Sequence, residues 1–325
     1  MIEGGEAKTF SISIEWENSR FAELGRTRRM LRRLREELIE LSPRREPPEV
    51  LFLYDRFTID GDLVDRVVTE EFQPQQTPAA TRIVPTDHLR YYQQKNLGAA
   101  LTRGQIVIFL DCDVVPERGW LGAMLAAFDD PAVDVVGGET YVELDGFLSR
   151  AFALFWLFSL RADDGDLAPA RFFHANNVAF RREIFNAHGF PDLPIYRGQC
   201  TLLGDAIATA RAGFFRLRGA RVSHPYPSSF GYFIARALHG GRDWVLVETV
   251  RAQSGRIRLG RVWTDYGQRL RDARQRIGGH RSEVSLGRVG AVGAMAIAFV
   301  YLSLQAAGGA LTLARPNLLP RLLPI

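Results

Sequence analysis

Short apolar runs alternate with stretches of helical periodicity over roughly the first two thirds of the chain. The alternation of apolar residues and serine at 10–14 predicts a first β-strand, and apolar runs at 50–54 and 106–110 predict two more. Residues 21–41 repeat apolar side chains among many arginines, which predicts an amphipathic helix, and a second helix is expected over residues 89–102. Because strands alternate with helices, we expect an α/β domain with a mostly parallel, doubly wound sheet.

The C-terminal part of the chain has a different pattern. No charged residue occurs between Val289 and Ala314, and this run is long enough to cross a bilayer as a helix. Arginines crowd the upstream side, which favours a cytoplasmic location for the preceding domain. We therefore expect a transmembrane helix over residues 287–314 in the inner (cytoplasmic) membrane, with a buried core helix as the alternative.

These patterns predict the organisation of the chain. The expected parts are an α/β domain, a helical arginine-rich juxtamembrane region, the transmembrane helix and a short tail, over residues 1–230, 231–286, 287–314 and 315–325. Residues 230–251 predict a helix that is interrupted at Gly240-Gly241. The aromatic stretch at 147–160 fits either a core helix or a helix at the membrane interface, and the sequence leaves both open.

Composition indicates the compartment and excludes disulfide-rich secreted proteins. The 325 residues are 46% hydrophobic, which allows a substantial core, and the net charge is only +4. Two cysteines, Cys112 and Cys200, make no disulfide framework, and we expect no signal peptide in the polar N-terminus. The basic face of the helix at 21–41 is interpreted as solvated, so no nucleic-acid partner is expected.

Two carboxylates follow the most apolar of the predicted strands. Asp111 and Asp113 come directly after the run at 106–110, and ligands of open α/β sheets gather beyond the carboxyl ends of strands. Alternate residues share a face, so both carboxylates can point into one crevice. Mg²⁺ and Mn²⁺ prefer carboxylate oxygens, and Mg²⁺ usually binds one or two carboxylates together with substrate phosphates. The functional interpretation is a metal–diphosphate site, and the structural alternative is an Asp-rich turn before a helix.

Three segments in chain order resemble the family-2 glycosyltransferases of the GT-A fold. The stretch from Lys95-Asn96-Leu97-Gly98 through Gly104 to Asp113 is similar to the family's Asn-x-Gly, strand and Asp-x-Asp. Residues 176–185 resemble its acceptor-side segment, and Asp205 with the following 211–213 and 222–224 resembles a third landmark. The resemblance covers roughly residues 10–230 and implies a GT-A (nucleotide-diphospho-sugar transferase) domain of a membrane-anchored bacterial type.

The resemblance also implies which residues bind the donor. Asp55 would contact the nucleotide base or ribose, and Asp111 would hold the ribose or sugar. Asp113 would bind Mg²⁺ or Mn²⁺, and His224 lies where some GT-A enzymes place a metal or phosphate ligand. His224 is otherwise an ordinary strand-end residue. The other residues expected on the nucleotide-sugar side are Glu15, Asn18, Lys95 and Asn96.

On the acceptor side, the resemblance implies that Asp205 is the general base that takes the proton from the acceptor hydroxyl. The alternative for Asp205 is a helix N-cap after Gly204. The other residues expected on this side are Asn176, Asn177, Arg242 and Trp244.

The sequence departs from the family pattern at three places. Glu15-Trp16-Glu17 replaces a proline-containing turn, Tyr54-Asp55-Arg56 replaces paired aspartates, and Gly204-Asp205 replaces Glu-Asp. These departures leave the base and the acceptor open.

The expected function is that of an inverting, metal-dependent glycosyltransferase. It would move a sugar from a nucleotide-diphosphate sugar to a hydroxyl acceptor, a lipid-linked or envelope/exopolysaccharide precursor. Inversion follows from the family alone. One alternative is a non-catalytic GT-A-like scaffold that binds nucleotide in a polysaccharide assembly complex. Another is a metal-dependent nucleotidyltransferase, although the chain has no Gly-rich, Lys-bearing phosphate loop.

Overall fold

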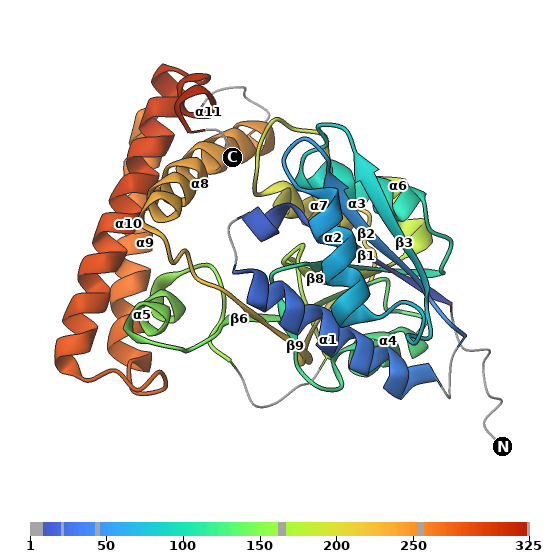
Figure 1. Cartoon of the computed structure of the whole chain (residues 1–325). Helices are drawn as coiled ribbons and strands as arrows, with labels where there is room; N and C mark the ends of the chain where they lie inside the picture. The colour runs from blue at the N-terminus through green and yellow to red at the C-terminus, as the bar shows by residue number, and fades with distance from the viewer. Residues whose placement is uncertain (1–8, 21–22, 43–45, 162–166, 253–256, 324–325) are drawn as a thin grey trace. The chain divides into compact units, whose positions relative to one another are not determined.

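The computed structural model describes residues 9–20, 23–42, 46–161, 167–252 and 257–323 (Figure 1). Contacts divide the chain into two compact units. The first comprises Met1–Thr140, Ala162–Asp192 and Leu203–Ser223, and the second comprises Tyr141–Arg161, Leu193–Leu202 and His224–Ile325. We call them the α/β unit and the helical unit.

Among the described residues, nine strands form one sheet in the order β3-β2-β1-β4-β8-β6-β9-β5, with β7 beside β9. The first four in this order are parallel: β3 (Ala80–Thr86), β2 (Glu49–Asp55), β1 (Phe10–Glu15) and β4 (Ile106–Asp111). Antiparallel pairings join the remaining strands, β8 (Asn177–Arg181), β6 (Val135–Val142), β9 (Phe214–His224), β5 (Val115–Pro116) and β7 (Leu167–Pro169). The α/β class is confirmed, but the sheet is mixed rather than mostly parallel, because an apolar run marks a buried strand without fixing its direction.

Helices cover both faces of the sheet in the α/β unit. One face packs against α1 (Leu24–Leu41), α2 (Gly61–Val67), a π-helical turn (Val68–Phe72) and α4 (Trp120–Ala126). The other carries α3 (Tyr91–Ala100) and α6 (Arg182–His188). In α1 the buried residues include Met30, Leu34 and Leu38, so the expected amphipathic helix is confirmed, with its arginines mostly towards solvent.

Four longer helices and one short helix make up most of the helical unit. They are α5 (Phe147–Phe155), α8 (Phe230–Arg251), α9 (Leu259–His280), α10 (Arg288–Ala314) and α11 (Leu318–Leu322). Helix α10 packs against α5, α8 and α9. The core between them includes Phe152, Trp156 and Tyr301.

Helix α8 is continuous, contrary to the expected interruption at Gly240-Gly241. The two glycines allow close approach between helices instead of breaking one. A Cβ at Gly241 would lie 1.8 Å from the carbonyl oxygen of Gln305, and a Cβ at Gly308 would lie 2.0 Å from that of Leu238. Small residues therefore bring the backbones of α8 and α10 together, as in many membrane helix pairs.

Helix α10 is the one described helix that is long and apolar enough to cross a membrane, with a mean hydropathy of 1.8 over its most apolar 18 residues. Its inner side buries Ala298, Tyr301 and Leu302. Its outer side leaves Val292 72% and Phe299 52% exposed. The helix is thus apolar on both sides.

The close contact of α8 with α10 predicts that Gly241→Ala destabilises the protein, because the added methyl overlaps the backbone of Gln305. We expect a loss of about 1–3 kcal/mol in the free energy of unfolding. Gly231→Ala in the same helix is the control, since nothing lies within 4 Å of its Cβ position. Thermal unfolding of the full chain in detergent measures both, and equal effects would contradict the helix-contact explanation.

Candidate active site

Two acidic residues end neighbouring parallel strands. Glu15 is the last residue of β1 and Asp111 the last of β4, and the two are paired in the strand register. Both side chains are fully buried. Two acidic groups therefore meet at the carboxyl edge of the sheet, where ligands of open α/β sheets gather.

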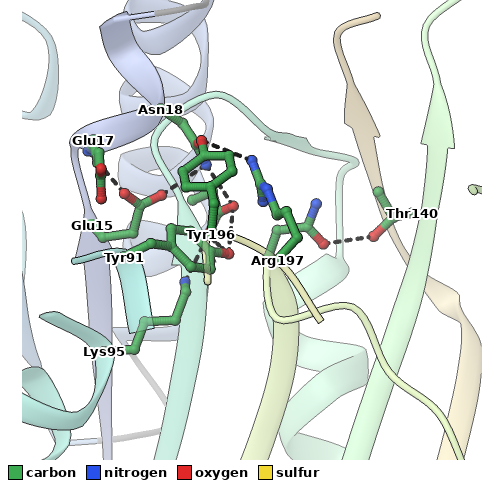
Figure 2. Close-up of polar contacts among 10 residues, drawn as sticks. Glu15, Glu17, Asn18, Tyr91, Lys95, Thr140, Tyr196 and Arg197 are labelled. Carbon is green, nitrogen blue, oxygen red and sulfur yellow. Dashed lines mark hydrogen bonds and ion pairs between the residues drawn. The ribbon is translucent and has the colours of Figure 1, made fainter. Parts of the chain in front are cut away.

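Asp111 is surrounded by three hydrogen-bond donors from two elements. The Nζ of Lys95 on α3 lies 2.6 Å from Oδ1, and the Tyr91 hydroxyl lies 2.9 and 2.8 Å from the two carboxylate oxygens. The Asn18 amide, in the 3₁₀ turn Glu17–Arg20, donates to Oδ2 at 2.9 Å. The ammonium group also lies 4.7 Å from the centre of the Tyr91 ring. Lys95 is itself without solvent exposure, so this is a fully buried ion pair (Figure 2).

Glu15 lies in the same network, where burial and a neighbouring carboxylate disfavour its charged form. Its carboxylate accepts hydrogen bonds from the backbone N–H of Glu17 at 2.8 Å and from the Asn18 amide at 2.9 Å. Burial raises the pKa of Glu15 well above its ordinary value, and the charge of Asp111 raises it further, while Lys95 acts in the opposite direction. Two acids and one cation thus share a dry environment, and Glu15 is the acid that favours its protonated form.

Asp113 lies two residues beyond the end of β4 and is 5% exposed. Its backbone carbonyl accepts from Nε of Arg26 at 2.5 Å, and the same guanidinium donates to the Ser223 hydroxyl at 2.8 Å. Arg26 therefore fixes the segment that carries Asp113. Between the two aspartates, burial raises the pKa of the Cys112 thiol well above its ordinary value, which makes it unreactive.

The described residues contain no cluster of three or more His, Cys, Asp or Glu side chains that could hold a metal ion. Asp111 already accepts from Lys95, Tyr91 and Asn18, so it fits a structural role better than that of a metal ligand. Asp113 fits a metal that takes most of its remaining ligands from substrate phosphates and water, as Mg²⁺ usually does.

Asp55, at the end of β2, organises the turn that follows it. Its carboxylate accepts from the backbone N–H groups of Phe57 at 3.2 Å and His88 at 3.1 Å, and from the Thr58 hydroxyl at 3.3 Å. The side chain is 6% exposed. Asp55 thus joins the loops after β2 and β3 at the edge of the sheet where β1 and β4 also end.

Several predicted site residues hold the fold together through side-chain amides. Asn96 exchanges two hydrogen bonds with the backbone of Phe190, at 2.8 and 3.0 Å. Asn177 accepts from the Trp120 indole at 2.8 Å and donates at 3.0 Å to the carbonyls of Glu139 and Ala220. These contacts stabilise the α/β unit. They give the two amides a structural role that is independent of any contact with a ligand.

Asn176 accepts a 3.1 Å hydrogen bond from the Thr140 hydroxyl and is buried. The two asparagines at 176 and 177 therefore differ: Asn176 makes one described contact, with β6, while Asn177 ties two strands and α4 together.

Asp205 lies inside α7 (Gln199–Thr209), where its carbonyl accepts from the Thr209 hydroxyl. The helix expected to open at Gly204-Asp205 thus begins earlier, after Gly198, whose φ of +98° ends the preceding loop. The N-cap alternative for Asp205 is wrong, because the residue stands in the body of the helix.

His224 is the last residue of β9 and is buried. Its Nδ1 lies 2.5 Å from the Pro225 carbonyl, and its ring contacts Trp156 and Phe158 at centroid distances of 5.5 and 4.6 Å. A metal at this histidine would have to bind Nε2. The preceding residue, Ser223, pairs with Val115 of β5.

Arg242 and Trp244 lie on α8 in the helical unit. Arg242 donates to Asp243 at 2.7 Å and to the Pro194 carbonyl at 2.7 Å, and Asp243 accepts from the backbone N–H groups of Tyr196 and Arg197 at 3.1 and 2.8 Å. The Arg242–Asp243 pair therefore holds the loop before α7. Trp244 lines a small cavity together with Tyr266 and lies 6.0 Å from the Arg269 guanidinium.

Sequence reasoning missed Tyr91 and Arg26, which contact Asp111 and the Asp113 carbonyl. Tyr91 could have been found, because it precedes Lys95 by four positions in a predicted helix and so shares its face. Arg26 is one of many arginines in α1, and nothing in the sequence separates it from the solvated ones.

Comparisons with known proteins agree with this geometry. The family described as Glycosyl transferase family 2 matches residues 61–189, which include Lys95, Asp111 and Asp113. The fold is similar to that of the mannosyltransferase PcManGT from Pyrobaculum calidifontis, solved with GDP-Man and Mn²⁺, at 14% identity and a TM-score of 0.58 over 96% of this chain and 88% of that one. It is also similar to GalNAc-T7, solved with UDP, GalNAc and Mn²⁺, at 15% identity and a TM-score of 0.50 over 72% of this chain and 51% of that one. No curated protein sequence matches the chain.

The fold is therefore that of the GT-A glycosyltransferases. The match of residues 61–189 to the family-2 glycosyltransferases, together with this fold, supports a sugar transferase.

The raised pKa of Glu15 predicts a pH-dependent stability. The folded protein binds this proton more tightly than the unfolded chain, so the contribution of Glu15 is present below the ordinary pKa of 4.5 and is lost as pH rises. Glu15→Gln keeps the hydrogen-bond acceptor and removes the charge. We expect its stability relative to wild type to be greater at pH 8 than at pH 5, because the wild-type protein must bury a charge once Glu15 ionises.

Urea unfolding at the two pH values measures this difference. Glu183→Gln, at an exposed position on α6, is the control and should follow the wild-type profile. Parallel profiles for wild type and Glu15→Gln would contradict the assignment.

Proposed function

We propose that the protein is an inverting, metal-dependent transferase that uses a nucleotide-diphosphate sugar as donor. The observation that carries the proposal is the buried network of Asp111, Lys95 and Glu15 at the carboxyl edge of β1 and β4, inside or beside the family-2 match. Asp55 and Asn18 would line the nucleoside pocket, and Asp111, Lys95 and Asn96 would stand at the ribose and sugar.

Asp113, with the donor's phosphates, would hold Mg²⁺ or Mn²⁺, and His224 is a further candidate ligand. Support comes from the two structural neighbours, both of which were solved with Mn²⁺. When bound, such a cation offsets the negative charge that develops on the leaving nucleoside diphosphate.

Asp205 is the proposed general base, and Asn176 and Asn177 the proposed acceptor-side residues. A hydroxyl is a poor nucleophile near neutral pH, so a carboxylate that takes its proton assists attack on the sugar carbon. Attack opposite the leaving group would invert the configuration. The half-buried position of Asp205 on α7 is compatible with contact to an incoming acceptor.

The proposed acceptor is a lipid-linked or envelope/exopolysaccharide precursor at the inner membrane, with the α/β unit on the cytoplasmic side. Support comes from α10, which is long and apolar enough to span a membrane, and from exposed apolar residues on α5, Phe147 at 45% and Leu148 at 42%. A protein held at the bilayer in this way meets its lipid-linked acceptor there.

The donor-side proposal predicts that Asp113→Ala and Asp205→Asn each abolish most turnover. Loss of one positioned acid–base group typically costs about 10²–10⁴-fold in rate. Metal-dependent release of nucleoside diphosphate from a panel of sugar nucleotides measures it. Asp129→Asn, at an exposed position, is the matched control and should keep full activity. Wild-type rates in both site variants would refute the proposal, and binding without turnover in wild type would favour the scaffold alternative.

The membrane proposal predicts that Phe299→Arg, on the exposed side of α10, weakens membrane association. A charge at the centre of a spanning helix costs about 2.5–3.5 kcal/mol on insertion scales. Ser282→Arg adds the same charge outside the helix and is the control, since Ser282 is exposed and precedes α10. Fractionation of cell membranes measures both, and equal partitioning of the two variants would contradict an α10 anchor.

A further inference from the structure

One buried arginine in the helical unit has no hydrogen-bonded acid or acceptor among the described residues, although its charge acts on the Asp243 carboxylate. Arg236 on α8 is only 6% exposed. Its side chain makes no hydrogen bond or ion pair with any residue in the described part of the chain, and its Nε is enclosed without an acceptor. A charge in the protein interior is costly unless it is paired, so such a group calls for a counter-charge from elsewhere.

The other buried cations of the described chain differ from Arg236 in this respect. Lys95 is paired with Asp111, and Arg26 donates to the Asp113 carbonyl and to Ser223. Arg242, on the same helix as Arg236, is paired with Asp243 and donates to the Pro194 carbonyl. Each of these cations thus has a hydrogen-bonded partner within the chain, although the Nε of Arg242, like that of Arg236, is enclosed without an acceptor.

Aromatic rings hold the Arg236 guanidinium in place. It lies 5.7 Å from the centre of the Trp156 ring and 6.0 Å from that of Tyr196. Rings bind a guanidinium through its face, which leaves the N–H edge for a ligand. That edge matches the oxygens of a phosphate group, which arginine binds in bidentate fashion.

A second guanidinium shares the Tyr196 ring. Arg197 lies 4.4 Å from the ring centre and donates to the Tyr196 hydroxyl at 3.1 Å (Figure 2). Asp243 fixes the backbone of both loop residues, so the pair of cations is held by α8. Two neighbouring positive charges favour an anion with more than one negative charge.

We infer that Arg236, assisted by Arg197, binds the phosphoryl linker between lipid and sugar in the acceptor. This inference rests on the proposed function. Trp156, which contacts Arg236, also donates its indole N–H to the Tyr301 hydroxyl of α10 at 3.1 Å. One contact chain therefore connects the cation to the apolar helix, and a ligand with a phosphate and a hydrocarbon chain uses both. Asp113, which is proposed to hold the cation at the donor's diphosphate, belongs to the other unit.

The test uses the full-length protein in detergent, with farnesyl phosphate as the probe and calorimetry as the readout. Arg236→Met preserves length and removes the charge, and we expect its affinity for farnesyl phosphate to fall about tenfold or more, as for the loss of hydrogen bonds to a charged group. Arg274→Met, at an exposed position on α9, is the control and should bind as wild type does.

Thermal unfolding without ligand distinguishes a role of Arg236 in ligand binding from a role in packing. If the chain gives Arg236 no counter-charge, Arg236→Met should melt at or above the wild-type temperature. A lower melting temperature with unchanged affinity for farnesyl phosphate would show a packing role and overturn the inference. If Arg236→Met does not fold, Arg236→Lys keeps the charge without the fork and should bind the probe more weakly than wild type; wild-type affinity in that variant would overturn the inference.

The same calorimetry is repeated with inorganic phosphate, UDP and GDP in place of farnesyl phosphate. If Arg236→Met weakens the binding of these ligands as much as it weakens the binding of farnesyl phosphate, the site binds free phosphate or the donor. That result would overturn the lipid assignment. The proposed function is tested independently, because Asp113→Ala affects turnover of the sugar nucleotide and should leave farnesyl phosphate binding intact.

Discussion

The α/β unit depends above all on the contact between the Lys95 ammonium and the Asp111 carboxylate. Parallel strands β1 and β4 bring two acids to one edge of the sheet, and neither is exposed to water. Removing one partner of a buried ion pair typically costs about 3–5 kcal/mol, because the other charge is left without compensation. The pair thus makes it possible to bury acids at the end of a strand, and the turn that carries Asn18 is hydrogen-bonded to it.

The helical unit depends on a different constraint, the close approach of α8 and α10. Gly241 and Gly308 remove the side chains that would otherwise separate the backbones. Helix α10 must then be apolar on the side that packs against α8 and is also apolar on the side that faces outward. A helix with two apolar sides has the composition of a membrane span, so composition alone could not separate packing from insertion.

Much of the sheet could be predicted from sequence, because β2 and β4 are continuous apolar runs, β1 alternates apolar residues with serine, and all three end in acids. What could not be predicted depends on contacts between distant residues. Asn96 and Asn177 match family segments, yet their amides bind Phe190, Trp120 and strand carbonyls. The glycine pair in α8 predicts a break when that helix is considered alone, because Gln305, the residue of α10 that it contacts, lies 64 residues later.

Whether a buried charge has a partner distinguishes structural from functional residues better than the position of the residue in a sequence motif does. In a low-dielectric interior each charge requires a partner, so a cation whose partner is supplied by the chain is explained by folding alone. Lys95 and Arg242 are of this kind, and their substitution would disturb stability and function together. Arg236 is not, because folding buries it against two aromatic rings without an acceptor. An anionic ligand would offset the cost of that arrangement, and no sequence pattern distinguishes such a cation from the paired ones.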